Sequence, residues 1–347
     1  MTHAILFFLA GTVSAGVTWL LVSTRIGNHL LDHPNERSLH DTPKPRVGGI
    51  GICVGVLLAY IIMTLIADSL PSTFMILAGG AFIVLVVSFV DDIRSLSVTV
   101  RIPFHFLAAG ILVATGLSLE QLSLGGATLS LPIGPGAALS LLYVVWMINL
   151  YNFMDGMDGF AGGMAVVGFG VLALLAADAG SVVIARSASA IAGAALGFLV
   201  FNFPPARVFM GDVGASTLGF LAAGISLWAD REQVIPLWIS LLLFSPFIVD
   251  ATITLLRRAL NREAIWRPHR SHYYQRLVRL GWGHRKTAIA EYLLMLACGV
   301  SAIIAVRVSP LGQWIVLTFW VIAYSVLILS IHRLELKKGV HGSAETV

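Results

Sequence analysis

A series of long apolar segments constrains this chain most, because many of them reach about 20 residues. A helix of that length crosses about 30 Å of hydrocarbon, which is the thickness of a bilayer core. Hydrophobic residues make up 57% of the 347 residues and charged residues 12%, whereas soluble globular proteins carry about a quarter charged residues. We therefore predict an all-α polytopic membrane protein, and its basic character does not indicate a nucleic-acid partner.

The apolar segments predict about eleven transmembrane helices. They cover approximately residues 4–24, 47–67, 71–90, 100–118, 137–152, 159–178, 181–201, 212–229, 234–256, 287–307 and 311–332. No basic residue precedes the first segment, so we expect a retained helix and not a cleaved signal peptide. We expect a hairpin at 122–135, one integral membrane catalytic domain over 1–338 and a disordered tail over 339–347. Cys53 and Cys298 lie in apolar spans and predict neither a disulfide nor a zinc site.

The distribution of basic residues predicts the orientation of these helices. If the loops are numbered alternately, nineteen of the 22 Lys and Arg residues fall in one set of loops. Basic loops face the cytoplasm in most membrane proteins. This pattern places the N-terminus outside and the C-terminus in the cytoplasm, and it brings every polar motif described below to the cytoplasmic face.

Carboxylates gather at the predicted helix ends of that face, in the pairs Asp91-Asp92 and Asp155/Asp158 and at Asp212. Acidic side chains beside a bilayer are costly unless they bind a metal ion or a charged substrate. A solvated helix end is the simpler alternative for Asp91-Asp92. Negative charge at a helix C-terminus opposes the helix dipole, however, which favours a functional role.

A regular spacing of three links Asn149, Asn152, Asp155 and Asp158. If this segment is helical, the last three side chains share one broad face. Ligands that offer only oxygen suit Mg²⁺ or Mn²⁺, and the absence of a nearby Cys or His cluster disfavours zinc. The spacing of an EF-hand calcium loop is also absent.

Asp212 is expected at the start of a helix, between Gly211 and Gly214. Backbone N–H groups at a helix N-terminus favour phosphate oxygens, although the Asp alone could be a structural cap. Phe209, just before it, could offer a ring on which a base stacks, and a plain core position is the alternative. Asp250 lies inside an apolar span, where an acidic residue indicates function or a structural hydrogen bond.

Basic loops on the same face offer groups that can contact phosphate. The segment 267–276 holds His269, Arg270 and His272, which could clamp a pyrophosphate, and the two histidines would share a face if helical. Anchoring to anionic lipid is the alternative. The first loop carries Lys44 and Arg46, which are equally well explained by membrane topology. Further basic and histidine positions are Arg101 and His105, and the latter suits an interhelical hydrogen bond.

The combined motifs resemble the polyprenyl-phosphate N-acetylhexosamine-1-phosphate transferases of glycosyltransferase family 4. The resemblance runs through PNERSLHDTPKPRVGG, VDDIRSLSVTVR, NFMDGMDGFAGG, FNFPPARVFMGD, DATITLLRR and RPHRSHYYQRL. It implies transfer of an N-acetylhexosamine-1-phosphate from a UDP-sugar to undecaprenyl phosphate, with release of UMP, in the bacterial cytoplasmic membrane. It also implies Mg²⁺ as cofactor, for which Mn²⁺ can substitute.

The resemblance assigns roles to individual residues. It implies that Asp212 binds the metal with Asn152 and that Asp91 lies near the lipid phosphate. Asp92 is expected at the same catalytic site, with one acid of this pair at the reacting centre and the other orienting it. Asp155 and Asp158 match paired site acids, the latter near the nucleotide, Phe209 matches the aromatic that meets uracil, and His269 and His272 match loop histidines near the diphosphate. The expected substrate contacts also include Asn149, Arg270, Lys44, Arg46 and Arg101.

Departures from the family pattern narrow the expected branch. The chain has HRSH where the branch that transfers phospho-MurNAc-pentapeptide has consecutive histidines, and this difference favours O-antigen or a similar polysaccharide. Ala215 stands where Ser is common. The alternatives are that pentapeptide branch, a secondary transporter and a CDP-alcohol phosphotransferase. The segment DGMDGFAGG of this chain does not match the motif of the CDP-alcohol phosphotransferases. A homodimer is compatible with the sequence, which does not decide the oligomeric state.

Overall fold

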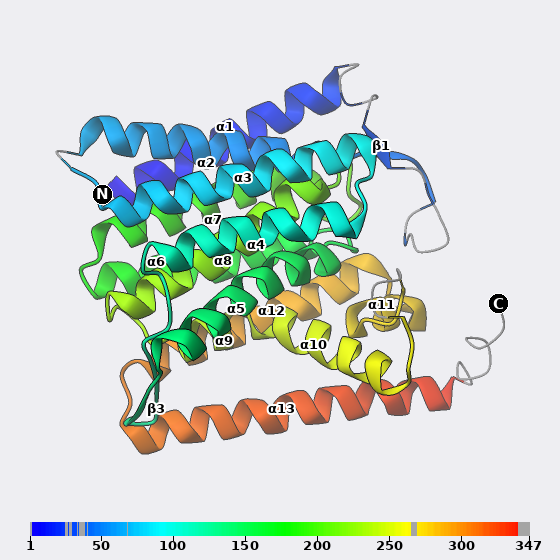
Figure 1. Cartoon of the computed structure of the whole chain (residues 1–347). Coiled ribbons are helices and arrows are strands. Elements are labelled where there is room, and N and C mark those ends of the chain that lie inside the picture. Colours follow the sequence, from blue (N-terminus) through cyan, green and yellow to red (C-terminus); the bar gives the residue numbers. More distant parts are fainter. Residues whose placement is uncertain are drawn as a thin grey trace.

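The computed structural model describes residues 2–24, 27, 30–32, 34, 39, 41–67, 69–264 and 269–338. Helices cross the molecule side by side from one end to the other (Figure 1). The first eight are α1 (Thr2–Ser23), α2 (Gly48–Ile66), α3 (Ser72–Arg94), α4 (Val98–Ala114), α5 (Ile133–Met154), α6 (Phe160–Asp178), α7 (Val182–Asn202) and α8 (Gly211–Arg231). The others are α9 (Leu237–Leu243), α10 (Ser245–Leu260), α11 (Tyr273–Leu277), α12 (Gly283–Ala305) and α13 (Pro310–Lys337). The predicted tail at 339–347 lies outside the described residues.

The described residues confirm a polytopic helical membrane protein. Nine helical segments are long and apolar enough to cross a bilayer, or ten if α9 and α10 form one span. The predicted count of eleven needs α4 as well, and that helix has only 17 residues. The expected short span at 137–152 is longer than predicted, because α5 has 22 residues.

Two of the predicted spans are not continuous helices. The span expected at 234–256 breaks at Phe244, where α9 and α10 meet at 81°. The span expected at 287–307 begins earlier than predicted, because α12 starts at Gly283. A π-helical turn (Val278–Trp282) connects α11 to α12, and Gly281 in this turn has a positive φ of 87°. Apolar content predicts how many residues sit in hydrocarbon, but it does not reveal a break that tertiary contacts stabilise.

Small residues let the central helices approach closely. A Cβ on Gly193 of α7 would lie 2.0 Å from the Phe7 carbonyl oxygen of α1, and one on Gly219 of α8 would lie 2.4 Å from the Met147 carbonyl oxygen of α5. Such contacts drive helix association in membranes, where apolar side chains gain little from leaving lipid. As a result α8 is almost completely enclosed by its neighbours.

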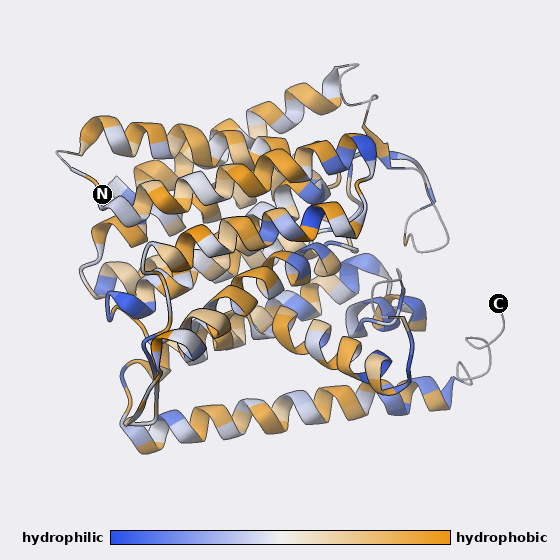
Figure 2. Cartoon of the chain, viewed as in Figure 1, coloured by the Kyte–Doolittle hydropathy of each residue, from blue (hydrophilic) through white to orange (hydrophobic). Residues whose placement is uncertain are grey.

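Polar residues concentrate at one end of the bundle (Figure 2). At that end strand β1 (Leu31–Asp32) pairs with β2 (Lys44–Pro45), which brings the first connecting loop back over the helices. The opposite end carries the predicted hairpin, which the antiparallel strands β3 (Gln121–Leu124) and β4 (Ala127–Ser130) confirm. Helix α1 begins at the hairpin end, and α13 ends at the polar end (Figure 1).

Candidate active site

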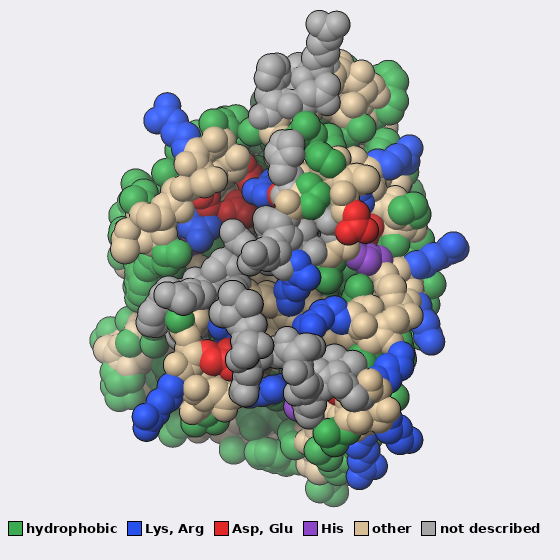
Figure 3. Space-filling view, turned by 90° about the vertical axis from the view of Figure 1, so that its right-hand side faces the viewer, with side chains coloured by type: hydrophobic (Ala, Val, Ile, Leu, Met, Phe, Trp, Pro, Cys, Tyr) green, Lys and Arg blue, Asp and Glu red, His purple; other side chains and the backbone are tan. Residues whose placement is uncertain are grey.

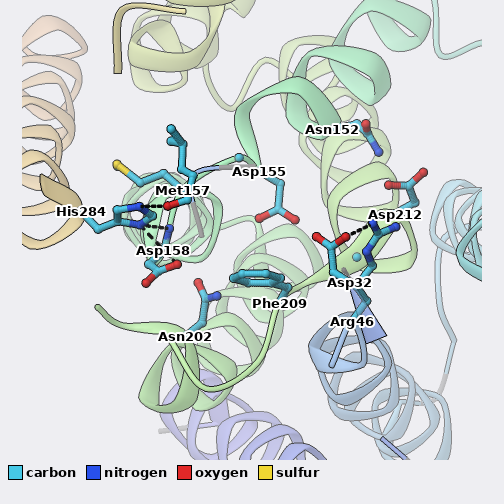
Figure 4. A pocket seen from close by; sticks show the side chains of 13 residues that line it. Asp32, Arg46, Asn152, Asp155, Met157, Asp158, Asn202, Phe209, Asp212 and His284 are labelled. Atoms are coloured by element: carbon cyan, nitrogen blue, oxygen red, sulfur yellow. Dashed lines mark hydrogen bonds and ion pairs between the residues drawn. The ribbon is translucent and has the colours of Figure 1, made fainter. Parts of the chain in front are cut away.

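A cavity of about 240 Å³ opens at the polar end of the bundle. Acidic side chains lie in a hollow of that face, with Lys and Arg side chains around it (Figure 3). The cavity is lined by Asp32, Leu39, Arg46, Asn152, Asp155, Gly156, Met157, Asp158, Asn202, Phe209, Gly211, Asp212 and His284. Six of the predicted site residues therefore meet there, from segments far apart in the chain (Figure 4).

The acidic turn that follows α5 forms one wall. The expected helical face is wrong here, because α5 ends at Met154 and α6 begins only after Gly159, whose φ is +78°. Two distant side chains fix the turn at Gly159. The Asn202 amide oxygen accepts a hydrogen bond from its N–H at 2.9 Å, and the Tyr292 hydroxyl donates to its carbonyl at 2.7 Å. A turn thus directs Asp155 and Asp158 into the cavity without a shared helix face.

Asp158 is held by groups from three other segments. Its Oδ2 accepts a hydrogen bond from the Ala206 N–H at 2.9 Å and lies 3.9 Å from Lys44 Nζ. Its Oδ1 lies 3.3 Å from Nδ1 of His284. Burial would raise the pKa of Asp158, but the hydrogen bonds from His284 and Ala206 outweigh burial and lower this pKa below its ordinary value. Asp158 is therefore a fixed anion at neutral pH.

His284, which lies at the start of α12, stands in no motif that singles it out. Its Nε2 donates to the Leu39 carbonyl oxygen at 3.1 Å, and its Nδ1 lies 3.3 Å from Asp158 Oδ1 and 3.4 Å from the Asp158 backbone nitrogen. A histidine in a basic loop was the one available signal. Asp32 and Asn202 were missed as well, and Asp32 forms an ion pair with Arg46 on the cavity wall.

Asp155 differs electrostatically from Asp158 although the two share one turn. Burial raises its pKa well above the ordinary value, and the negative charges of Asp212 and Asp92 raise it further. A carboxyl group in this setting ionises readily only when a cation arrives. Asp158 is therefore a permanent negative charge, whereas Asp155 would ionise when a cation binds beside it.

Asp212 occupies the first turn of α8 and faces a guanidinium group. Arg101 Nη1 donates to Asp91 Oδ2 at 2.6 Å and to Asp212 Oδ2 at 3.0 Å, so one arginine bridges two predicted site acids. Asn152 lies beside Asp212 on the wall of the cavity (Figure 4). Asp91 is additionally fixed by the Leu96 N–H, which donates to its Oδ1 at 2.6 Å.

Asp92 does not point into the cavity but caps a helix. Its two oxygens accept hydrogen bonds from the backbone N–H groups of Asp212 at 2.9 Å and Val213 at 3.0 Å. A Cβ on the preceding Gly211, which has a φ of +75°, would lie 2.8 Å from Asp92 Oδ2. In this structure Asp92 therefore positions Asp212, which fits the expectation that one acid of the pair orients the site, and its catalytic role stays a prediction.

A cation and an aromatic ring lie together near the other side of the cavity. Lys44 Nζ lies 5.1 Å from the centroid of the Phe209 ring, as well as 3.9 Å from Asp158. The loop that carries Phe209 is tied to the start of α2, since the Gly48 N–H donates to the Phe209 carbonyl at 2.9 Å. These contacts assemble a ring face, a positive charge and a fixed anion in one place.

The histidine loop lies apart from the residues that line the cavity. His269 and His272 do not share a helix as expected, because α11 begins only at Tyr273, yet their ring centroids lie 4.8 Å apart. His272 is 2% exposed, and its Nδ1 donates to Asp250 Oδ1 at 3.1 Å. Burial and the neighbouring His272 lower the pKa of His269. Arg270 is half-buried in the same loop.

Asp250 organises that loop. Its Oδ1 accepts from the Tyr273 N–H at 3.0 Å and its Oδ2 from the Tyr274 N–H at 3.1 Å, so it caps α11 from α10. The Tyr274 hydroxyl donates to the Phe153 carbonyl at 3.2 Å, directly before the acidic turn. The loop thus supports the cavity from behind.

Asn149 is also outside the cavity. Its amide nitrogen donates to the Val145 carbonyl at 2.7 Å within α5 and lies 3.5 Å from Nδ1 of His105. His105 is buried, as the expected interhelical histidine would be. Both residues connect α4 and α5 below the cavity in this structure.

The donor set fits a magnesium ion. The described residues contain no cluster of three or more His, Cys, Asp or Glu side chains arranged to hold a metal. Mg²⁺ does not need one, because it is usually held by one or two carboxylates together with water and substrate phosphates. Asp212 and Asn152 are adjacent oxygen donors on the wall that Asp155 shares.

An acidic cavity at the polar end of an apolar helical bundle defines a multi-pass membrane protein with a site for a charged ligand. The family model described as Glycosyl transferase family 4 matches residues 73–230. A probable undecaprenyl-phosphate N-acetylglucosaminyl 1-phosphate transferase of Bacillus subtilis is 32% identical over 82% of this chain and 78% of its own length. An undecaprenyl-phosphate alpha-N-acetylglucosaminyl 1-phosphate transferase of Yersinia pestis is 28% identical over 87% of this chain and 84% of its own.

A decaprenyl-phosphate N-acetylglucosaminephosphotransferase of Mycobacterium tuberculosis is also 28% identical, over 82% of this chain and 79% of its own length. The chain therefore belongs to glycosyl transferase family 4, which confirms the family predicted from the motifs. It is a membrane transferase whose relatives carry names of sugar-phosphate transferases. None of these names refers to O-antigen, so they do not support the pathway expected from HRSH.

Proposed function

We propose that this protein transfers an N-acetylhexosamine-1-phosphate from a UDP-sugar to a polyprenyl phosphate, releases UMP, and works at the cytoplasmic face of a bacterial inner membrane. The observation that carries the proposal is the cavity in which Asp155, Asp158 and Asp212 meet next to Phe209 and basic side chains. Undecaprenyl phosphate is the acceptor favoured by the names of the relatives from Bacillus subtilis and Yersinia pestis.

The reaction joins two anions. An oxygen of the lipid phosphate attacks the sugar-linked phosphorus, a new P–O bond forms, and the bond to the bridging oxygen breaks so that UMP leaves with both electrons. The second pKa of a phosphate monoester is about 6, so the attacking oxygen is mostly ionised at neutral pH and needs no strong base. Positioning and charge neutralisation therefore carry most of the catalysis.

The chain supplies positive charge from fixed directions. Arg101 is held between Asp91 and Asp212 and can turn its remaining donors to a phosphate. Lys44 is 3.9 Å from Asp158, which keeps its ammonium group beside the Phe209 ring. In this arrangement Asp91 orients Arg101, and no role as a base is required of it.

Opposite ends of the cavity suit different parts of the donor. The Phe209 ring offers a face on which uracil can stack, with Asp158 fixed nearby as a hydrogen-bond acceptor. Asp212, Asn152 and Asp155 would hold Mg²⁺ at the other end, where a bound ion neutralises charge on the phosphates. Mn²⁺ has the same preference for oxygen and should replace it.

The 81° break between α9 and α10 resembles the broken helices of secondary transporters. Asp250 on α10 has a structural partner, however, because it caps the loop helix α11. The acids of the cavity also lie at helix ends and not in the middle of the spans, at the end of the bundle where Figure 2 shows hydrophilic residues. These contacts therefore favour the transferase over the transporter.

The test is UMP release by purified protein with Mg²⁺, undecaprenyl phosphate and a panel of UDP-N-acetylhexosamines. We expect release with at least one sugar and a loss of at least about a hundredfold in Asp212→Asn, the scale on which a single electrostatic group acts in catalysis. Asp178→Asn, at the exposed hairpin end, is the matched control and should keep full activity. Activity retained in Asp212→Asn would remove the metal assignment, and no release with any UDP-sugar would refute the function.

A further inference from the structure

The glycines of the acidic turn lie against tyrosines that are distant in the chain. The segment NFMDGMDGF places one glycine directly after each of its two acids. A Cβ on Gly156 would lie 2.2 Å from the hydroxyl oxygen of Tyr274, and a Cβ on Gly159 would lie 2.7 Å from the hydroxyl oxygen of Tyr292. Each glycine therefore leaves room for a phenol hydroxyl that reaches the turn from the C-terminal part of the chain.

Tyr274 contacts the backbone on both sides of Asp155. Its hydroxyl donates to the carbonyl oxygen of Phe153 at 3.2 Å, and Phe153 is the second-to-last residue of α5. The last four carbonyl groups of a helix have no partner within the helix, so this carbonyl needs a donor from elsewhere. The same hydroxyl lies against Gly156. One oxygen atom thus fixes the chain directly before and directly after Asp155.

The Tyr274 side chain is itself held firmly. It is completely buried, and its backbone N–H donates to Asp250 Oδ2 at 3.1 Å. Its ring packs against Phe160 of α6, with the ring centroids 4.8 Å apart. Because both the backbone and the ring are fixed, the hydroxyl group has one well-defined position.

The two acids of the turn differ in what holds their side chains. Asp158 accepts a hydrogen bond from the Ala206 N–H at 2.9 Å, and its other oxygen lies 3.3 Å from His284. Within the described part of the chain, no group donates a hydrogen bond to the Asp155 carboxylate, on which only burial and charge act (Figure 4). The position of the Asp155 carboxylate therefore depends on its backbone, whereas Asp158 has supports of its own.

We propose that Tyr274 is a positioning residue that holds the Asp155 carboxylate where it can join Asp212 and Asn152 around Mg²⁺. This inference rests on the proposed function, because it explains how one ligand of the metal is kept in place. Without the hydroxyl, the turn loses its contacts on both sides of Asp155, and the carboxylate can move away from the ion. Removal of a group that orients a metal ligand typically weakens metal binding about 10–100-fold.

The experiment measures Mn²⁺ binding from the electron paramagnetic resonance signal of the free ion, with the protein in detergent and no nucleotide present. Tyr274→Phe removes only the hydroxyl, and we expect the Kd for Mn²⁺ to rise about tenfold. Asp155→Asn should also raise the Kd, and the addition of Tyr274→Phe to Asp155→Asn should cause no further rise. Residues that act through one another are not additive, whereas a general weakening of the fold would add to the loss.

Transferase activity gives a second measurement. UMP release by Tyr274→Phe should fall about tenfold at limiting Mg²⁺, in proportion to the weaker metal binding. Excess Mg²⁺ should restore the release, because the hydroxyl acts on the position of a ligand and not on the reacting atoms. 

Two other tyrosines provide matched controls. Tyr292→Phe removes a hydrogen bond of 2.7 Å to the Gly159 carbonyl, at the other end of the same turn, and should leave the Kd for Mn²⁺ close to that of wild type. Tyr324→Phe removes a hydroxyl 2.7 Å from Ser245 Oγ, between α13 and α10, and should change neither Mn²⁺ binding nor UMP release. Each control loses one partly buried hydrogen bond, as the test variant does, so all three variants should show a similar fall in Tm.

Gly156→Ala tests the same contact from the side of the turn. Its methyl group would lie 2.2 Å from the Tyr274 hydroxyl oxygen, so the hydroxyl or the turn must shift. The Kd for Mn²⁺ should therefore rise in this variant as well, which provides a second test if Tyr274→Phe folds poorly.

Four results would overturn the inference. An unchanged Kd in Tyr274→Phe would mean that Asp155 is placed without the hydroxyl. An equal rise in Tyr292→Phe or Tyr324→Phe would mean that any lost tyrosine contact weakens the site through the fold. A further rise on adding Tyr274→Phe to Asp155→Asn would mean that the tyrosine acts by another route. Wild-type protein that binds no Mn²⁺ would remove Asp155 from a metal site. If the expected Mn²⁺ results hold but no UDP-sugar yields UMP, the role of Tyr274 stands and the proposed function fails.

Discussion

Replacement of Asp92 by Ala should destabilise the start of α8, because this carboxylate caps the helix from outside. The variant removes two hydrogen bonds, from the N–H groups of Asp212 and Val213. A hydrogen bond to a charged group contributes about 1.5–3 kcal/mol, which sets an upper limit of about 3–6 kcal/mol. Water can reach Asp212, whose side chain is 29% exposed, and hydrogen bonds to water will replace part of the lost stabilisation. Loss of an N-cap typically costs about 0.5–2 kcal/mol.

We therefore expect Asp92→Ala to lower the free energy of unfolding by about 2–4 kcal/mol, which lowers the apparent Tm by about 4–8 °C in a chain of this size. Asp92→Asn should fall between wild type and Asp92→Ala, since the amide keeps one acceptor oxygen and presents its N–H₂ group to the second backbone donor. The assay is thermal unfolding in detergent, followed by intrinsic fluorescence.

Asp178→Asn is the control for this series. Asp178 ends α6 at the other end of the bundle and pairs with Arg307 at 2.8 Å, but both side chains are more than half exposed. Exposed pairs contribute about 0–1 kcal/mol, so this variant should melt close to wild type. An unchanged Tm in Asp92→Ala, or an equal loss in Asp178→Asn, would refute the assignment of Asp92 as a cap.

Two further variants test the site and its support. Because burial raises the pKa of Asp155, the folded protein loses stability as the pH rises from the ordinary carboxyl pKa to the raised one, by at most about 1.4 kcal/mol per pH unit. Asp155→Asn should remove this pH dependence of stability and should have a higher Tm than wild type at pH 8 in EDTA. Its transferase activity should fall at least about tenfold. If the pH dependence persists in the variant, another group causes it. Asp250→Asn should lower activity at least about tenfold, because Asp250 holds Tyr274. Asp230 is an equally buried cap at the hairpin end, where it accepts from the Leu237 N–H at 2.7 Å. Asp230→Asn should therefore lower Tm without lowering activity. Equal activities of these two variants would mean that Asp250 only stabilises the fold.

The candidate site was predictable from sequence in its acids but not in their roles. Asp155, Asp158 and Asp212 stand at the ends of apolar segments, and a bilayer leaves a helix end as the only inexpensive place for such charges. Asp92 has the same local surroundings as Asp91, yet only the start of α8, 120 residues further on, makes it a cap. No local pattern contains a partner at that separation.

The histidines also show that sequence patterns do not identify the residues of the cavity: two predicted histidines lie outside it, and one that was not predicted lines it. His269 and His272 were selected because a basic loop with two histidines is unusual, and the structure packs them around Asp250 beside the cavity wall. His284 carried no comparable pattern, although its Nδ1 lies 3.3 Å from Asp158. Spacing along the chain indicates which residues have a chemical capacity, while the packing of α12 against the acidic turn decides which of them reaches a partner.

The membrane class, most of the spans, the hairpin and the family follow from the amino-acid sequence, because hydrophobic length and local motifs are properties of contiguous residues. The break at Phe244, the turn that replaces a helix at Asp155, and the bridge from Arg101 to Asp91 and Asp212 arise from tertiary contacts. These features depend on hydrogen bonds and charges between helices that the chain brings together only when it folds. Their energies are therefore fixed by contacts across the bundle and not by the order of residues within one segment.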